Sequence, residues 1–145
     1  EKPKLIFAGT TAYPRKIDWR KFAEAAEVSG AYLMADISHI AGLVIGGEHE
    51  SPVDYADVIM TTTHKTLRGP RGAVLLVTEK GLKKDPDLGK KIDKGVVPGI
   101  QGGPHENQVA GIAVAMQEVD RPEYKKYNYR DCRYSRYWSN RLLRF

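Results

Sequence analysis

Apolar residues gather in four short runs along the chain, at residues 5–8, 31–35, 56–60 and 73–77. Glycine, polar or threonine-rich segments bound these runs, which favours short buried strands. Between the first two runs, apolar side chains recur with the spacing of a helical face: Trp19, Phe22, Ala23, Ala26 and Val28. Asp18 is a good N-cap for this helix, and Gly30 is a good C-terminal stop. The strand–helix–strand order predicts a βαβ unit with parallel strands and a right-handed crossover.

The second half of the chain is more polar. Residues 79–94 are rich in lysine, aspartate and glycine and predict a surface helix with a loop, whereas residues 96–104 predict a glycine-rich loop. A second helical stripe follows and ends near Val119. The turn at residues 69–72 reverses the chain, so the strand at 73–77 is expected to run antiparallel to its neighbour. Together these elements predict a three-layer α/β domain with a mostly parallel sheet.

Composition narrows the class of protein. With 145 residues, 41% hydrophobic and 28% charged, the chain is long enough for one domain with a real core. No apolar run approaches the ~20 residues that span a membrane. Cys132 is the only cysteine, so there is no intrachain disulfide framework and no cysteine zinc cluster, and we expect a cytoplasmic setting. Because the chain begins without methionine, we expect it to be an internal piece of a longer protein.

The net charge of +5 raises the question of nucleic-acid binding. Its distribution argues against this function, because residues 128–145 hold five arginines and one acid, while the first 127 residues are nearly balanced. We therefore divide the chain into a domain at residues 1–127 and an atypical basic tail at residues 128–145. Either an out-of-frame sequence or a disordered segment would explain this tail. A non-catalytic role of this tail on single-stranded nucleic acid stays open as an alternative.

Chemistry-bearing side chains follow three of the predicted strands. Thr11 comes after the first, Asp36 and His39 after the second, and His64 and Lys65 after the third. In open α/β sheets the carboxyl ends of the strands form the ligand crevice, so these groups should converge. An amine, a carboxylate and a histidine in one crevice suggest pyridoxal phosphate, whose aldehyde forms a Schiff base with lysine and whose ring nitrogen pairs with aspartate.

Each of these groups also has a simpler interpretation. Lys65 could be a solvated lysine in a basic loop, Asp36 a helix cap and His39 a satisfied loop histidine. Gly102 and Gly103 could form an ordinary turn before a helix, or supply backbone N–H groups to a phosphate. Spacing alone does not decide between these interpretations.

Several segments, in order and with similar spacing, resemble serine hydroxymethyltransferase, also called glycine hydroxymethyltransferase. The segments are Ala12-Tyr13 with Ile17-Asp18-Trp19, then residues 30–33, 35–42, 61–72 and 98–104, and the resemblance covers residues 3–127. It implies the central part of the large domain of fold-type I pyridoxal-phosphate enzymes. It also implies a transferase of one-carbon metabolism that interconverts serine and glycine, with tetrahydrofolate as co-substrate and no metal.

The resemblance implies roles for individual residues. Lys65 matches the lysine that binds pyridoxal phosphate, Asp36 the partner of the pyridinium nitrogen, and His39 a histidine beside the phenolic oxygen. Thr11 falls where many members have serine, and His64 precedes the lysine near the cofactor. The remaining matches are Arg71, as active-site support, and Gly102 and Gly103, as the loop that reaches the cofactor phosphate of the neighbouring subunit.

The implied assembly is a homodimer or homotetramer with shared sites. The family's arginine for the substrate carboxylate lies outside the resembling segments, so we expect this chain alone to lack transferase turnover. Another pyridoxal-phosphate enzyme of the same fold, such as a threonine aldolase, is the main alternative, and a folded relic without activity is another.

Overall fold

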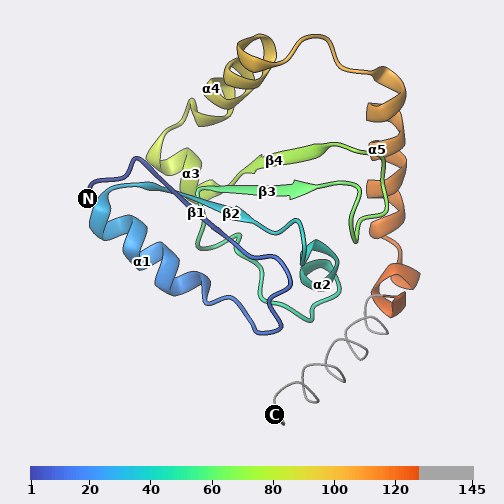
Figure 1. Ribbon diagram of the computed structural model, residues 1–145, viewed down its shortest axis with the longest axis horizontal. Helices are drawn as coiled ribbons and strands as arrows, with labels where there is room; N and C mark the ends of the chain where they lie inside the picture. The colour runs from blue at the N-terminus through green and yellow to red at the C-terminus, as the bar shows by residue number, and fades with distance from the viewer. Residues whose placement is uncertain (128–145) are drawn as a thin grey trace.

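The structure is a computed structural model that describes residues 1–127; the basic tail predicted at 128–145 lies outside the described residues. Four strands, β1 (Leu5–Gly9), β2 (Tyr32–Asp36), β3 (Val58–Thr62) and β4 (Ala73–Val77), form one sheet in the order β1-β2-β3-β4 (Figure 1). The pairs β1–β2 and β2–β3 are parallel, and β3–β4 is antiparallel. The predicted α/β class, the mostly parallel sheet and the reversed last strand are confirmed.

Helix α1 (Trp19–Ser29) connects β1 to β2, as the apolar spacing predicts. The Asp18 carboxylate accepts the Lys21 backbone N–H at the start of the helix. Gly30 ends it with φ at 72°, a left-handed conformation that glycine adopts without a steric penalty. Both predicted caps are therefore present.

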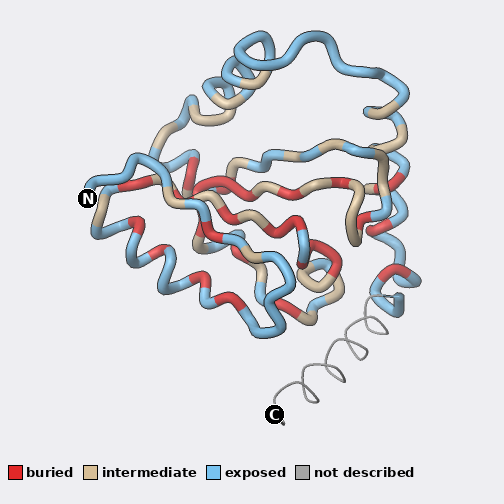
Figure 2. The backbone as a smooth tube through the Cα atoms, viewed as in Figure 1, coloured by how far each residue is buried: buried red, intermediate tan, exposed pale blue. Residues whose placement is uncertain are grey.

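The core lies where α1 packs against one face of the sheet (Figure 2). Trp19, Leu33 and Ala35 are fully buried there. The face of the sheet that points away from α1 is less covered within the described residues: Phe7 is 61% exposed, and Leu5 and Leu75 are also exposed. The described core is thus concentrated on the α1 side.

A cluster around Trp19 fixes the entry into α1. The indole N–H donates to the Glu50 carbonyl at 3.0 Å, and the His49 ring meets the indole edge-on at a centroid distance of 6.0 Å. His49 Nε2 accepts the Ile17 backbone N–H at 3.1 Å, and Nδ1 lies 2.8 Å from the Glu50 carbonyl. Because His49 is buried and bonded through both nitrogens, it holds the segment before β3 against the start of α1.

The structure also contains α2 (Ala41–Ile45), α3 (Glu79–Lys84), α4 (Leu88–Lys94), a kinked helical turn η1 (Gly95–Ile100) and α5 (Glu106–Val119). The prediction of a loop over the whole of 96–104 is wrong in its first half, because η1 continues from α4. The kink lies at Val97, which has extended φ and ψ of −127° and 117°, as expected for the residue before Pro98. Among the described residues, no helix is long and apolar enough to cross a membrane.

Candidate functional site

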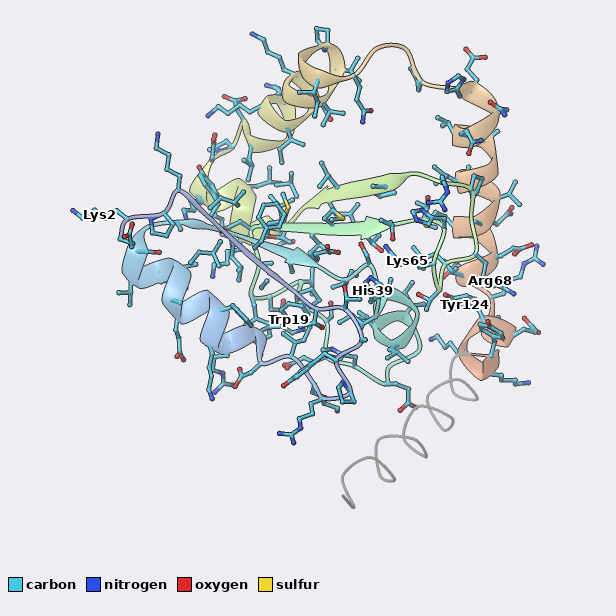
Figure 3. The ribbon with its side chains drawn as sticks, in the orientation of Figure 1. Lys2, Trp19, His39, Lys65, Arg68 and Tyr124 are labelled. Carbon is cyan, nitrogen blue, oxygen red and sulfur yellow. The ribbon has the colours of Figure 1, made fainter. Side chains whose placement is uncertain are left out.

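The parallel strands bring their carboxyl ends to one edge of the sheet. Gly9 pairs with Asp36, and Asp36 pairs with Met60, so the segments after β1, β2 and β3 begin side by side. Figure 3 shows His39 and Lys65 at this edge, between the end of β3 and helix α2. The structure therefore brings Asp36, His39 and Lys65 to the same side of the sheet, as expected from the sequence.

Lys65 lies in a turn, residues 63–72, that we call the lysine turn. The Lys65 ammonium group is partly buried and donates to Thr62 Oγ1 at 2.9 Å. The turn is closed by Thr63, which is fully buried: its backbone N–H donates to the Gly72 carbonyl at 3.0 Å and its hydroxyl to the Pro70 carbonyl at 2.6 Å. The Gly69 N–H donates to the Thr63 carbonyl at 2.7 Å. These bonds fix the backbone on both sides of the lysine.

Helix α5 packs closely against the back of the lysine turn. A Cβ atom at Gly72 would lie 2.8 Å from Ile112 Cδ1, and one at Gly111 would lie 2.6 Å from Pro70 Cγ. Real Cβ atoms do not approach so closely, and the Pro70 ring cannot move aside as the end of the Ile112 side chain can, so the contact requires glycine at Gly111. The Gly-Pro-Arg-Gly pattern thus encodes a tight contact as well as a chain reversal.

The segment after α5 adds a second contact to the lysine turn. Tyr124 is 2% exposed, and its hydroxyl donates to the carbonyl of Thr66, the residue after the lysine, at 2.8 Å. The Arg68 guanidinium lies 5.4 Å from the centre of the Tyr124 ring and 3.6 Å from the Glu118 carboxylate. A cation over an aromatic face is attractive, so Arg68 ties the turn to α5 at its surface.

The last residue of β2, Asp36, carries the candidate carboxylate. Asp36 is half-buried, and its Oδ1 accepts the Ser38 backbone N–H at 2.9 Å. His39 is exposed at the same edge. The loop after β2 is joined to the lysine turn where the Gly42 N–H, at the start of α2, donates to Thr66 Oγ1 at 3.0 Å. The carboxylate and the lysine are therefore held by segments that contact each other directly.

His64 and Arg71 form a pair at opposite ends of the lysine turn. Arg71 Nη1 lies 3.5 Å from His64 Nε2, a distance at the outer limit of a hydrogen bond. His64 Nδ1 is buried and has no hydrogen-bond partner among residues 1–127. Arg71 is exposed, so it is accessible to a bound anion at this edge.

Three other predicted residues lie apart from this cluster. Thr11 is exposed in the loop after β1, at the same edge of the sheet. Gly102 and Gly103 lie in the loop that precedes α5, whereas Tyr124 follows the other end of that helix. A Cβ atom at either glycine would meet no atom of the described structure within 4 Å. Contacts within the described residues therefore do not explain why glycine stands at these two positions.

The groups at the edge fit pyridoxal phosphate chemically. The cofactor offers an aldehyde carbon, which Lys65 can bind, and a ring nitrogen, which a carboxylate can pair with. Asp36 uses Oδ1 for the bond to Ser38, which leaves Oδ2 for a ring N–H. His39 and Thr11 are exposed and able to reach a bound ligand from the solvent side. The donor set therefore matches the cofactor expected from the sequence.

Sequence reasoning did not single out the residues that position this set. Thr62, Ser38, Thr66 and Tyr124 make the hydrogen bonds around Lys65 and Asp36, but only their neighbours were predicted as site residues. The threonine run before the lysine was a usable signal for Thr62, since it places hydroxyls at a strand end. Tyr124 lies 58 residues from its partner Thr66, so no local pattern reveals it.

Comparison with known proteins identifies the family. The family model described as serine hydroxymethyltransferase matches residues 1–144. The chain is 52% identical over 141 residues to the serine hydroxymethyltransferase of Prochlorococcus marinus (strain NATL1A). The aligned residues make up 97% of this chain and 33% of that protein. It is 56% identical over 126 residues to that of Mesoplasma florum, covering 87% and 29% of the two chains. The relative from Acidothermus cellulolyticus is 57% identical over 127 residues, covering 88% and 28%.

The chain spans about a third of the length of the curated relatives that it matches. The matched relatives carry the name expected from the resemblance, which favours that interpretation over a threonine aldolase of the same fold. The match over residues 1–144, together with the α/β fold, shows that this chain belongs to the serine hydroxymethyltransferase family.

Proposed function

We propose that this chain forms the cofactor-binding centre of a pyridoxal-phosphate-dependent serine hydroxymethyltransferase. The reaction is the interconversion of serine and glycine, with transfer of the one-carbon unit to tetrahydrofolate. The observation that supports the proposal is the linkage between two strand ends: Asp36 is the last residue of β2, Lys65 follows the end of β3, and hydrogen bonds through Ser38 and Thr62 connect them. The family match supports the choice of reaction.

Pyridoxal phosphate, when bound, supplies a ring that withdraws electrons from the substrate α-carbon. Lys65 would bind its aldehyde carbon, with the nitrogen held at the end of β3 by the Thr62 hydroxyl. Asp36 would hold a proton on the ring nitrogen through Oδ2, since an adjacent carboxylate favours the charged form of a base. The hydrogen bonds made by Thr63 within the lysine turn would hold the Lys65 nitrogen near the end of β3.

The remaining predicted residues are proposed to contact the cofactor from its periphery. His39 and Thr11 are proposed to bond the phenolic oxygen of the cofactor, and His64 to lie near the ring. Arg71 is accessible and is proposed to support anionic groups at the active site. These roles are supported by the sequence positions of the residues, which follow the carboxyl ends of β1, β2 and β3.

Gly102 and Gly103 are proposed to bind the cofactor phosphate of a neighbouring subunit. A Cβ atom at either glycine would meet no described atom within 4 Å, so the structure leaves room for another chain to approach the backbone there. This arrangement requires at least a homodimer, or a homotetramer built from dimers. We further propose that the protein works in the cytoplasm.

An absorption titration tests the proposal. Purified chain is mixed with pyridoxal phosphate, and the spectrum is compared with that of a Lys65→Ala variant. We expect a visible band that saturates with cofactor in the parent and is absent from the variant. A parent spectrum equal to that of free pyridoxal phosphate, or a band that survives in Lys65→Ala, would overturn the assignment of Lys65.

A further inference from the structure

The loop after β2 and the lysine turn belong to different strands, and one buried side chain joins them. Ser38 is 3% exposed. Its Oγ accepts the backbone N–H of Thr62 at 3.0 Å and donates to Met60 Sδ at 3.5 Å. A thioether is a weak acceptor, so the bond from Thr62 is the stronger of the two. Ser38 therefore connects its own loop to the last residue of β3.

This contact extends the sheet beyond its regular end. The β2–β3 pairing stops at Asp36 and Met60, after which the Ile37 N–H still donates to the Met60 carbonyl at 2.9 Å. The next bond between the segments uses the Ser38 hydroxyl in place of a backbone carbonyl. The Ser38 side chain thus replaces a backbone carbonyl as the acceptor, at the point where the backbones that follow β2 and β3 separate.

Three hydrogen bonds in sequence then link the two candidate catalytic groups. Asp36 Oδ1 accepts the Ser38 N–H at 2.9 Å, and Ser38 Oγ accepts the Thr62 N–H at 3.0 Å. Thr62 Oγ1 accepts from Lys65 Nζ at 2.9 Å. The path therefore runs from the carboxylate to the amine through Ser38 and Thr62, and each link is within ordinary hydrogen-bond distance.

We propose that Ser38 is a positioning residue, which sets the Asp36 carboxylate and the Lys65 amine at the separation that pyridoxal phosphate requires. The inference rests on the proposed function. In this role Ser38 acts through Thr62 on one side and Asp36 on the other. Without its hydroxyl, the Thr62 N–H loses its acceptor and the strand end that carries Lys65 is no longer tied to the Asp36 loop.

The test compares Ser38→Ala with Ser29→Ala. Ser29 is a matched control because its hydroxyl donates to the Ala25 and Ala26 carbonyls on α1, away from the site. The first measurement uses the cofactor-free chain and records hydrogen exchange of the Thr62 amide, relative to the Ile59 amide in the same strand. We expect exchange at Thr62 to accelerate by about fivefold to tenfold in Ser38→Ala only, the equivalent of one lost hydrogen bond.

The second measurement is the dissociation constant for pyridoxal phosphate, from the Lys65-dependent band. We expect it to rise about fivefold to tenfold in Ser38→Ala, to be unchanged in Ser29→Ala, and to return toward the parent value in Ser38→Thr, which restores the hydroxyl. Melting temperatures of the three variants separate this effect from a general loss of stability.

The outcomes are distinguishable. If the parent shows the band and Ser38→Ala binds the cofactor as tightly as Ser29→Ala, Ser38 has only a structural role and the inference is wrong, while the proposed function stands. If the parent shows no Lys65-dependent band, the proposed function is wrong, and the positioning role of Ser38, which depends on it, is wrong as well. If exchange at Thr62 is the same in Ser38→Ala and the parent, the connecting bond itself is refuted.

Discussion

The contact between α5 and the lysine turn makes Gly111→Ala an informative substitution. In an exposed helix, replacing an interior glycine by alanine stabilises the folded state by about 0.5–1 kcal/mol. Here the new Cβ would lie 2.6 Å from Pro70 Cγ and 3.4 Å from Pro70 Cδ. Normal carbon–carbon contacts are ~3.5–4.0 Å, so the overlap with Pro70 Cγ is about 1 Å. The proline ring cannot rotate away, because its φ is fixed by the ring.

Overpacking of this kind costs about 1–3 kcal/mol, which exceeds the gain in helix propensity. We therefore expect Gly111→Ala to lower the free energy of unfolding by about 1 kcal/mol. Urea unfolding at equilibrium gives this value from the shift in midpoint at constant slope. The expected sign is the opposite of what helix propensity alone predicts.

Gly89→Ala is the matched control. Gly89 also lies in a helix, α4, but the nearest atom to its new Cβ is Val77 Cγ2 at 4.0 Å, an ordinary contact. We expect this variant to be more stable than the parent by about 0.5 kcal/mol, since only propensity changes. If Gly111→Ala stabilises the chain as much as Gly89→Ala does, α5 does not brace the lysine turn and the reasoning is refuted.

Three further substitutions test other contacts. Tyr124→Phe removes a buried hydrogen bond to the lysine turn and should lower the free energy of unfolding by about 1 kcal/mol in the urea assay. Tyr127→Phe, at an exposed position, should change this free energy by less than about 0.5 kcal/mol. Gly30→Ala places a Cβ on a residue with φ of 72° and should cost about 1 kcal/mol or more, visible as a lower melting temperature. The hydrogen bond from Lys91 holds the pKa of Asp85 below its usual range. The pair therefore stabilises the α3–α4 junction at pH values above the ordinary aspartate pKa, and this stabilisation is lost as the pH falls through the lowered pKa. An NMR titration should show the Asp85 pKa rising in Lys91→Ala, and an unchanged pKa would contradict this.

Local signals predicted the fold well because each was reinforced by its neighbours. One helix is predicted by three signals together: the Asp18 cap, the apolar stripe and the stop at Gly30. Because a short apolar run stands on each side of this helix, the simplest topology is a pair of parallel strands joined by it. The error at η1 arose because glycine and proline favour loops locally, while the helical conformation continues from α4 into η1 and is interrupted only at Val97, the residue before Pro98.

The candidate site was predictable only at its strand ends. The sequence placed Asp36 and Lys65 at one edge because parallel strands align their carboxyl ends. It could not show that Ser38 joins them, since the Ser38–Thr62 bond spans 24 residues and depends on register. The glycines of the lysine turn were read as turn residues, and their packing against α5 depends on a helix that follows some 40 positions later.

Covalent trapping of the cofactor tests the central claim most directly. Pyridoxal phosphate is added to the purified chain, reduced with borohydride, and the labelled peptides are mapped by mass spectrometry. The many exposed lysines of the chain serve as internal controls, because Lys65 is the one placed at the end of β3 with its nitrogen held by Thr62. We expect one label, on Lys65, at cofactor concentrations that leave the surface lysines unmodified. A label spread over the surface lysines, with Lys65 no more reactive than they are, would contradict the account.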